Sequence, residues 1–334
     1  MIEIESSAPG RCGIVGNPSD MYGGSVVSCT TQERAHCKLS KYSGGIHLLN
    51  GDEARVLATK EERVFKGDKL DIAVAALLYF EIDPASIEFQ LELRTDIPMR
   101  AGLAGSTAML ATLVGVFDAL LQLKFSRYHL AETTRKIEAR VMGITCGFQD
   151  QHMAIFGGLN FMSFVGKESL EQRDEEPLGV IEPLASFAER PPLLLAHTGV
   201  QHNSSAVHSS PRQRWLAGDI QVRRNYARIA ELSILAKRAV VEQNWREIGG
   251  LMNENHALVA ELGGSGPDNE RLIQAALEAG AWGAKLAGAG GGGTIITLTD
   301  DPEKLGAALE SAGADGLYTP MPQPGLTVVR YDSM

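Results

Sequence analysis

The sequence predicts an α+β fold that is divided into two domains. Strand patterns and helix patterns are mixed along both halves of the chain, as in α+β proteins. A polar, proline-bearing stretch at residues 167–192 separates the halves, and 334 residues are enough for two hydrophobic cores. We therefore expect an N-terminal domain over residues 1–185 and a C-terminal domain over residues 186–334.

Strands are expected early in the chain where apolar and polar side chains alternate, the pattern of a half-buried strand. They cover residues 2–7, 25–29, 35–42, 54–58 and 87–94. The first and last alternate most clearly, and the third and fourth are the weakest. A glycine-rich segment at residues 10–24 follows the first strand, and residues 70–80 predict a helix.

A loop with proline and glycine at residues 95–105 leads into an apolar helix of small residues at 106–123. Ser126 is placed to cap a second helix that runs to about residue 141, because a serine hydroxyl can accept from the first N–H groups of a helix. Residues 143–158 predict a loop with a short helical stretch, and residues 159–164 a strand.

The second half begins with a buried strand, continues with long helices and ends with a strand, a helix and a strand. The expected strands cover residues 193–197, 294–298 and 326–331, and the expected helices cover residues 219–242, 245–261, 268–279 and 302–311.

Composition and charge exclude several classes of function. The net charge of −10 argues against a general nucleic-acid or membrane-surface binder, since both need a basic surface. The N-terminus has neither the basic start nor the apolar core of a signal peptide. The four cysteines form no C-x-x-C pair, so we expect reduced cysteines in a cytoplasmic protein.

The strongest local signal lies at residues 95–112, where a strand ends, a glycine-rich loop turns and a helix begins. Gly102 and Gly105 allow the backbone to turn its N–H groups toward an anion, and the helix N-terminus adds its dipole. Ser106 or Thr107 places a hydroxyl near a phosphate oxygen or Mg²⁺. This arrangement suits phosphoryl transfer, although a glycine loop that only caps a buried helix is the alternative.

A second glycine cluster occupies residues 285–293. Gly288, Gly290 and Gly293 formally match the dinucleotide-binding pattern G-x-G-x-x-G, but a strand pattern follows where that fold needs a helix. We therefore reject a dinucleotide fold. The segment must instead pack its backbone close to a ligand or to another loop. No sequence for a P-loop of the Walker type is present.

Two carboxylates in residues 137–158 are candidates for chemistry. Asp150 lies among glycines and apolar residues, where it could act as a general base or anchor a substrate. Glu138, on the preceding helix, could reach the same cleft as a metal ligand. The alternatives are a helix cap for Asp150 and a solvated surface position for Glu138, the latter favoured because most helical carboxylates are exposed.

Together these segments resemble the three motifs of the GHMP kinases, the galactose, homoserine, mevalonate and phosphomevalonate kinase superfamily. Motif one corresponds to APGRCGIVGNPSDMYGG at residues 8–24, motif two to residues 98–108 and motif three to residues 285–293. They occur in the order of the family and span most of the chain. The resemblance implies an S5-like N-terminal domain and a ferredoxin-like C-terminal domain, with the active site between them.

The resemblance also implies roles for individual residues. Asp150 matches the catalytic aspartate that accepts the proton of the sugar hydroxyl, and Arg11 matches the motif-one arginine near the reacting groups. Asp20 matches a carboxylate that hydrogen-bonds substrate hydroxyls. Glu138 matches the Mg²⁺-binding glutamate of the sugar-kinase branch, and Thr107 or Ser106 matches the hydroxyl ligand of Mg²⁺.

ATP and Mg²⁺ are the cofactors implied by the resemblance. The phosphates of ATP would lie mainly on backbone N–H groups of the loop and the first turn of its helix. The residues expected to bind them are Ala101, Gly102, Leu103, Ala104, Gly105, Ser106 and Thr107. The family usually has Gly at position 104 and Ser at position 107. The methyl group of Ala104 matters only if φ is positive there.

Local strings narrow the branch of the family. GNPSD at residues 16–20, followed by Tyr22, and VHSSPRQRWLAGD at residues 207–219 resemble glucuronokinases. QDQHMAIFGGLNFMSF and GAWGAKLAGAGGGG resemble the heptose-phosphate and fucose kinases. These groups phosphorylate a sugar at its anomeric oxygen, so we expect a sugar 1-kinase, with D-glucuronate as the first candidate substrate.

The partner is therefore expected to be a small sugar, with no nucleic acid and no membrane, and the oligomeric state is not predicted. The carboxylate of a uronic acid needs a partner, and a guanidinium can bind it through two hydrogen bonds. The expected substrate-binding residues are Asn17, Asp20, Tyr22, Arg212, Arg214, Gly290 and Gly291. An exposed position on a surface helix is the alternative for both arginines.

Three other functions are weighed. A heptose-7-phosphate or fucose-type 1-kinase is the nearest alternative, and a phosphorylated sugar would need further basic groups in the pocket. A catalytically silent sugar-binding sensor is disfavoured because the chain retains its candidate catalytic groups. A metal-binding protein that uses His197, His202 and His208 is weak, since their spacing does not match a usual helical pair of ligands.

Overall fold

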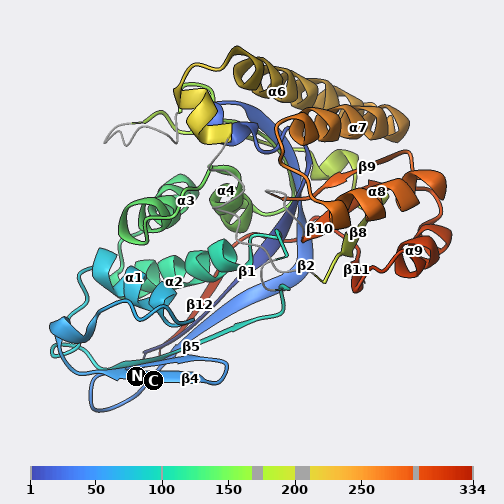
Figure 1. Ribbon diagram of the computed structural model, residues 1–334. Helices are drawn as coiled ribbons and strands as arrows, with labels where there is room; N and C mark the ends of the chain where they lie inside the picture. The colour runs from blue at the N-terminus through green and yellow to red at the C-terminus, as the bar shows by residue number, and fades with distance from the viewer. Residues whose placement is uncertain (1, 99–100, 168–175, 200–210, 289–292, 333–334) are drawn as a thin grey trace.

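The computed structural model describes residues 2–98, 101–167, 176–199, 211–288 and 293–332. Two sheets organise the chain (Figure 1). In the first, strands run in the order β12-β1-β2-β5-β3-β4, and β6 extends it by pairing with β2 and β7. The second has the order β11-β8-β10-β9. Helices cover both sheets, and the α+β prediction is confirmed.

The strands of the first sheet are β1 (Ile2–Val15), β2 (Ser25–Ser40), β3 (Ile46–Asn50), β4 (Glu53–Leu57), β5 (Phe89–Thr95), β6 (Leu159–Ser163), β7 (Val180–Pro183) and β12 (Thr327–Asp332). Those of the second are β8 (Leu193–His197), β9 (Gly283–Leu286), β10 (Thr294–Leu298) and β11 (Gly316–Tyr318). The α-helices are α1 (Asp71–Tyr79), α2 (Gly105–Leu121), α3 (Arg127–Lys136), α4 (Gln149–Phe156), α6 (Ile220–Val241), α7 (Trp245–Glu261), α8 (Pro267–Glu278) and α9 (Pro302–Ser311).

The first two strands are longer than the sequence suggests. β1 continues to Val15, although residues 10–24 were expected to form a glycine-rich connection, and its register against β2 shifts between Pro9 and Arg11 and between Gly13 and Val15. The strands expected over residues 25–29 and 35–42 are one continuous strand, β2. Pairing on either side of its polar middle joins the two expected strands into one: β6 pairs with Ser25–Cys29, β5 pairs with Ala35–Ser40, and β1 pairs with both halves.

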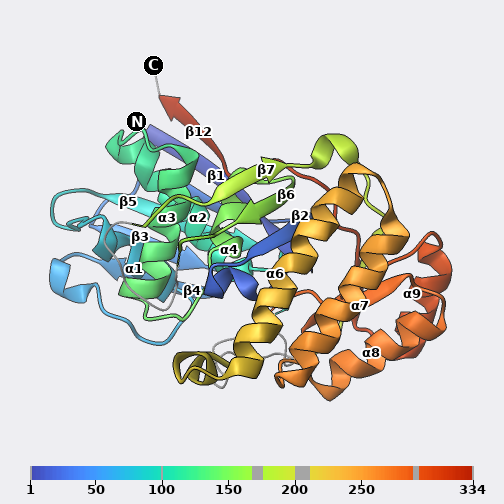
Figure 2. The same cartoon turned by 90° about the horizontal axis from the view of Figure 1, so that it is seen from above.

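Helix α2 is the centre of the N-terminal core. Every residue from Thr107 to Phe117 is buried, which explains why the helix is apolar on all sides. It packs on β1 and β2, with α1, α3 and α4 beside it (Figures 1 and 2). Ser126 caps α3 as expected, since its hydroxyl accepts from the N–H of His129 at 3.2 Å.

In the second half, α6 and α7 lie side by side (Figure 2), and α8 and α9 pack against the four-stranded sheet (Figure 1). The sequence did not reveal the short strands β3, β7, β9 and β11. After the second sheet the chain returns to the first, where the last strand, β12, pairs antiparallel with β1, from Ile2↔Asp332 to Ser7↔Thr327. The division at residue 185 stays a prediction.

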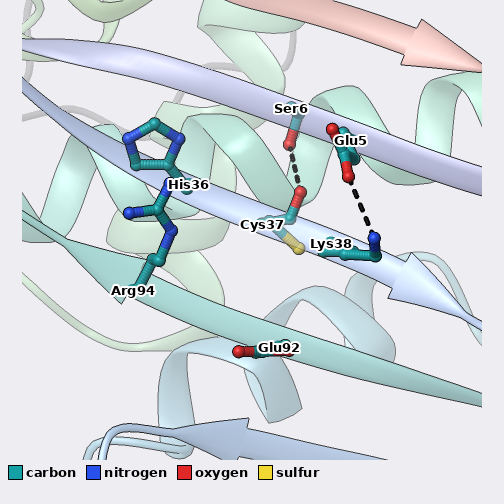
Figure 3. Close-up of a pocket in the computed structure, with 7 residues that line it drawn as sticks. All are labelled: Glu5, Ser6, His36, Cys37, Lys38, Glu92 and Arg94. Carbon is teal, nitrogen blue, oxygen red and sulfur yellow. Dashed lines mark hydrogen bonds and ion pairs between the residues drawn. The ribbon is translucent and has the colours of Figure 1, made fainter.

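Two surface features complete the fold. Within the described ranges, we find no helix that combines the length and the apolar character needed to cross a bilayer. A hollow on the first sheet is lined from β1, β2 and β5 by Glu5, Ser6, His36, Cys37, Lys38, Glu92 and Arg94 (Figure 3). The hollow includes none of the residues predicted for catalysis.

Candidate active site

Residues 101–104, which are predicted to bind phosphate and are called the phosphate loop from here on, lead directly into α2. Gly102 has φ +76°, and Ala104, which precedes the helix, has φ +59°. The backbone of Ala104 is therefore in the left-handed conformation, which costs an alanine about 1 kcal/mol relative to its preferred conformation because of its methyl group. The chain turns sharply here, and α2 begins directly after the turn. The first N–H groups of a helix have no partner within it, so together with the helix dipole they can stabilise an anion at this end.

The glycine segment of motif three packs against this loop. A Cβ atom on Gly288 would lie 2.5 Å from the carbonyl oxygen of Gly102, and one on Gly293 would lie 2.8 Å from that of Ala101. The N–H of Arg11 donates to the carbonyl of Leu103 at 3.0 Å. Glycine at these positions thus allows one loop to approach another. Gly290 and Gly291, expected to contact the substrate, lie outside the described residues.

Arg11 and Asp150 form a bidentate salt bridge beside the phosphate loop. Nε of Arg11 donates to Oδ1 of Asp150 at 2.7 Å, and Nη2 donates to Oδ2 at 2.9 Å. Nη1 of Arg11 donates to the carbonyl of Gly102. The side chain of Arg11 is 7% exposed and that of Asp150 is 30% exposed. The buried guanidinium therefore orients a carboxylate that solvent and substrate can still reach.

Asp20 holds the start of the helix that carries Asp150. Its Oδ2 accepts from the N–H groups of Phe148 and Gln149 at 2.8 and 3.0 Å, just where α4 begins. Burial raises the pKa of Asp20, and the charge of Asp150 raises it further, while these two hydrogen bonds oppose both effects. One carboxylate oxygen is thus used in positioning α4.

Thr107, in the first turn of α2, is in contact with Glu138. Thr107 Oγ1 donates to Glu138 Oε1 at 2.7 Å, and Gln151 Nε2 donates to Glu138 Oε2. Glu138 is buried in a π-helical turn, Ile137–Val141, so the alternative of a solvated surface position is wrong. Burial raises the pKa of Glu138 to about 7. Ser106, one residue earlier, is exposed.

The Thr107–Glu138 pair suits a magnesium ion. Mg²⁺ takes oxygen ligands in octahedral geometry at about 2.1 Å, so that neighbouring ligand oxygens lie about 3 Å apart. The separation of 2.7 Å between Thr107 Oγ1 and Glu138 Oε1 is close to that value. Burial disfavours the charged form of Glu138 and so raises its pKa, and a cation there would stabilise that form.

Asn17 and Tyr22, both expected to bind substrate, have different surroundings. Asn17 is 1% exposed, and its side chain bonds Lys285 and the carbonyl of Gly288, which gives it a structural role instead. Tyr22 is half-buried and stacks on Tyr226, with 4.1 Å between ring centroids. Burial raises the pKa of Tyr22 to about 12.

Arg212 and Arg214 lie in a helical segment at residues 211–216, next to this aromatic cluster. Burial raises the pKa of both tyrosines. The positive charge of Arg212 opposes this rise in Tyr22, and that of Arg214 opposes it in Tyr226. Arg214 donates to Asp219 at 2.8 Å, whereas Nε of Arg212 is buried with no hydrogen-bond partner in the described part of the chain. Arg212 is thus the better placed of the two to meet a substrate anion.

The histidines suggested as metal ligands do not support that function. His197 is buried on β8, and its Nδ1 accepts from the N–H of Gly199 at 3.1 Å. His202 and His208 lie outside the described residues. Across the described ranges, no cluster of three or more His, Cys, Asp or Glu side chains could hold a metal ion, and all four cysteines are free.

Sequence reasoning missed several residues that support the site. Gln151 holds Glu138, and Ser28 Oγ donates to Gln149 Oε1 at 2.6 Å. Two glutamines flank Asp150 in the string FQDQH, and their position on either side of the candidate base was the signal that could have revealed them.

Comparison with known proteins gives two family matches. The model described as "GHMP kinases N terminal domain" matches residues 70–158, and the one described as "GHMP kinases C terminal" matches residues 236–316. The first includes the phosphate loop, Glu138 and Asp150. The second includes the glycine cluster of residues 285–293.

Several curated relatives match nearly the whole chain. A D-glycero-alpha-D-manno-heptose 7-phosphate kinase of Campylobacter jejuni is 25% identical, covering 91% of each chain. A mevalonate kinase of Pyrococcus abyssi is 25% identical over 97% of each chain, and glucuronokinase 1 of Arabidopsis thaliana is 27% identical over 90% of this chain and 87% of its own. A galactokinase of Lactococcus lactis, solved in complex with galactose, shares the fold with a TM-score of 0.77 at 18% identity, covering 97% of this chain and 95% of its own.

Proposed function

This chain belongs to the GHMP kinase family, and from that premise we propose that it transfers the γ-phosphoryl group of ATP to the anomeric hydroxyl of a sugar, with D-glucuronate as the best candidate. The observation that carries the proposal is the Arg11–Asp150 pair beside the phosphate loop. It combines an orienting cation with a reachable carboxylate next to a helix N-terminus, which are the parts that in-line phosphoryl transfer requires.

In this proposal each residue has a defined task. The Asp150 carboxylate accepts the proton of the attacking sugar hydroxyl, and Arg11 orients Asp150 and offsets charge near the transferred group. Backbone N–H groups of residues 101–107 bind the phosphates of ATP. Thr107 and Glu138 would hold Mg²⁺, together with Ser106, whose hydroxyl is exposed in the first turn of α2. When bound, Mg²⁺ neutralises charge on the phosphate oxygens.

The choice of an acidic sugar rests on the residues around Tyr22. The rings of Tyr22, Tyr226 and Trp215 lie together. Tyr226 is buried, so the half-buried Tyr22 and Trp215 are the rings that a sugar could reach, and the charge of Arg212 lowers the pKa of Tyr22 against the rise caused by burial. A guanidinium there could bind a carboxylate through two hydrogen bonds. The likeness to glucuronokinase 1 of Arabidopsis thaliana supports the same choice.

A heptose 7-phosphate is the second candidate, supported by the Campylobacter jejuni relative and by the same arginines, since a guanidinium also binds phosphate. A catalytically silent sugar sensor would have no need of the Arg11–Asp150 and Thr107–Glu138 pairs together. Cytoplasmic location stays a prediction.

The test is ADP release from purified protein with Mg-ATP and a panel of acceptors. The panel holds D-glucuronate, D-galacturonate, L-fucose, galactose, mannose, a heptose 7-phosphate and mevalonate, with phosphorus NMR on each product. Turnover with glucuronate that gives an anomeric phosphate supports the proposal. Turnover with another sugar but not with glucuronate would contradict the choice of D-glucuronate. Turnover with mevalonate alone would contradict the proposal that the acceptor is a sugar.

A matched set of variants tests the arginines. Arg212→Met is expected to raise the KM for glucuronate about tenfold or more, because a charged hydrogen bond of roughly 1.5–3 kcal/mol is lost, with the KM for ATP unchanged. Arg214→Met should have a smaller effect, since Arg214 is already paired with Asp219. Arg224→Met, at an exposed position on α6, is the control. An unchanged KM for glucuronate in both test variants would exclude the arginines as carboxylate ligands.

A further inference from the structure

Lys285 is a buried cation that the proposed chemistry does not use. It lies on β9 at the start of the glycine segment, and its side chain has no exposed surface. Its Nζ donates to the side-chain oxygen of Asn17 at 2.8 Å, to the carbonyl of Gly13 at 3.3 Å and to the carbonyl of Leu286 at 2.5 Å. All three acceptors are uncharged, so Lys285 is not held by an ion pair among these contacts.

The number of acceptors matches the ammonium group. An ammonium carries three N–H donors and no acceptor, whereas a neutral amine carries two donors. Three oxygens around Nζ therefore use every donor of the charged form. Burial lowers the pKa of Lys285 to about 7, the neighbouring Arg11 lowers it as well, and Cys12 opposes this. His256 of α7 is a further titratable neighbour, whose pKa Lys285 lowers.

Contacts lead from Lys285 to the phosphate loop. Asn17, held by Lys285, donates through Nδ2 to the carbonyl of Gly288 at 3.3 Å. Gly13, whose carbonyl also accepts from Lys285, donates its N–H to the carbonyl of Ala287 at 3.1 Å. Two residues that Lys285 contacts, Gly13 and Asn17, thus hold residues 287 and 288.

Gly288 in turn touches the loop itself. Its Cα lies so close to Gly102 that an added Cβ would meet the Gly102 carbonyl oxygen at 2.5 Å. That same oxygen accepts from Nη1 of Arg11, the residue that orients Asp150. A displacement of the glycine segment would therefore change the shape of the phosphate loop and the position of Arg11.

We propose that Lys285 is a positioning residue for the nucleotide, which acts by holding Asn17 and Gly13 so that residues 287–288 support the phosphate loop. The proposal rests on the proposed function in one respect, namely that the loop binds ATP. It assigns Lys285 no contact with ATP or sugar.

The experiment is calorimetric titration of the full-length protein with ATP, which reports the dissociation constant and the number of binding sites separately. Lys285→Met is expected to weaken ATP binding tenfold or more with about one site per chain. Lys304→Met, at an exposed position on α9, is the matched control and should bind ATP as the wild type does. A merely structural lysine would lower the number of sites and leave the dissociation constant unchanged.

Asn17→Asp is the second variant, in case the methionine variant does not fold. The aspartate keeps an oxygen for Lys285 and adds a charge that favours the ammonium, but it cannot donate to the Gly288 carbonyl. It should therefore fold and bind ATP weakly. Wild-type affinity in a folded Lys285→Met or in Asn17→Asp overturns the inference. A wild type that does not bind ATP overturns the proposed function instead, so the two failures are distinguishable.

Discussion

Arg11 and Asp150 define the centre of the site at the scale of single residues. Both oxygens of the carboxylate accept from one guanidinium, so the pair has a fixed orientation, and Gly102 ties the same guanidinium to the phosphate loop. The proposed base, the loop and the positive charge are therefore coupled through the side chain of Arg11. Removal of the carboxylate charge should affect chemistry far more than nucleotide binding.

Asp150→Asn is expected to lower kcat about 100-fold or more, since general-base catalysis contributes that much and an amide cannot accept the proton in the same way. ATP binding should be retained because residue 150 is not among those expected to bind the phosphates. The measurement is kcat from ADP release, with the ATP dissociation constant as control. An Asn variant that keeps most of its activity would remove Asp150 from the role of base.

The buried side chain of His152 should make the stability of the protein depend on pH. His152 in α4 is fully buried, with Nδ1 2.7 Å from the carbonyl oxygen of Phe148, and burial lowers its pKa from 6.5 to about 4. The folded state thus keeps His152 neutral where the unfolded chain protonates it. The free energy of unfolding should therefore fall as the pH drops from 6.5 toward 4, by about 2 kcal/mol between pH 7.5 and pH 5 from this residue.

Urea unfolding of the wild type and of His152→Gln at pH 7.5 and pH 5 measures this contribution. The variant should show a smaller loss of stability between the two pH values. His129→Gln, which changes an exposed histidine, is the control and should keep the wild-type loss. Equal losses in wild type and His152→Gln would show that other groups cause the acid sensitivity.

Part of the site could be predicted at this scale. The sequence indicated Asp150, Glu138 and Thr107, and the structure brings them together with Arg11 around the phosphate loop. Glu138 was expected at a solvated surface position because most helical carboxylates are exposed, and the sequence could not show that a π-helical turn directs the side chain inward. Nor could it show that Asn17 is enclosed by Lys285 and Gly288, since those partners lie about 270 positions away along the chain.

At the scale of elements, glycines on α7 and β9 allow the backbones of the helix and the strand to lie in contact. A Cβ atom on Gly249 would lie 2.5 Å from the carbonyl oxygen of Trp282, and one on Gly283 would lie 2.3 Å from that of Gly249. The helix backbone and the strand backbone are thus in direct contact, directly beside Lys285. The neighbouring Gly250 is exposed and would place a Cβ in open space.

The two adjacent glycines of α7 therefore predict opposite effects. Gly249→Ala should destabilise the protein by about 1–3 kcal/mol, since the added methyl group must push the helix away from β9. Gly250→Ala should stabilise it by up to about 1 kcal/mol, because alanine favours a helix over glycine at an exposed position. Urea unfolding of both variants measures the two changes. A Gly249→Ala variant as stable as the wild type would contradict the close contact.

At this scale, long elements could be predicted from the sequence and short ones could not. The long helices α6, α7 and α8 have enough turns to show their apolar stripe, and they were expected nearly where they lie. β9 and β11 have four and three residues, too few for alternation to be visible. The junction within β2 was missed because the flanking segments, which pair with β1, β5 and β6, hold it in one strand, and its own pattern does not show this.

At the scale of the whole molecule, β12 connects the end of the described chain to its beginning. Its inner side packs on α2, where a Cβ on Gly115 would meet Leu326 and Val328 side chains at 2.9 Å, and Arg330 donates to the carbonyl of Ala119 at 3.0 Å. Arg34 holds the preceding turn by donating to the carbonyls of Pro324 and Gly325. The last strand thus contacts α2 from the surface of the N-terminal half, with Val328, Val329 and Tyr331 still 37–50% exposed.

Removal of residues 327–334 is expected to lower the Tm by more than 5 °C and to cause aggregation, because it uncovers α2 and leaves the β1 edge unpaired. Val329→Lys is the matched control, since Val329 is 48% exposed on the outer side of the same strand, and its Tm should stay near that of the wild type. Thermal unfolding followed by circular dichroism and light scattering measures both. A truncated protein with wild-type Tm would show that β12 adds little to the core.

The pairing of β12 with β1 also sets an order of events during translation. The ribosome makes β1 first, but the partner on its outer edge emerges only after the whole second sheet has been made. Until then the nascent chain carries an open strand edge, the kind of surface to which other chains can add. Completion of the first domain must therefore wait for the last strand, so folding of the two halves is coupled in time although their sheets are separate.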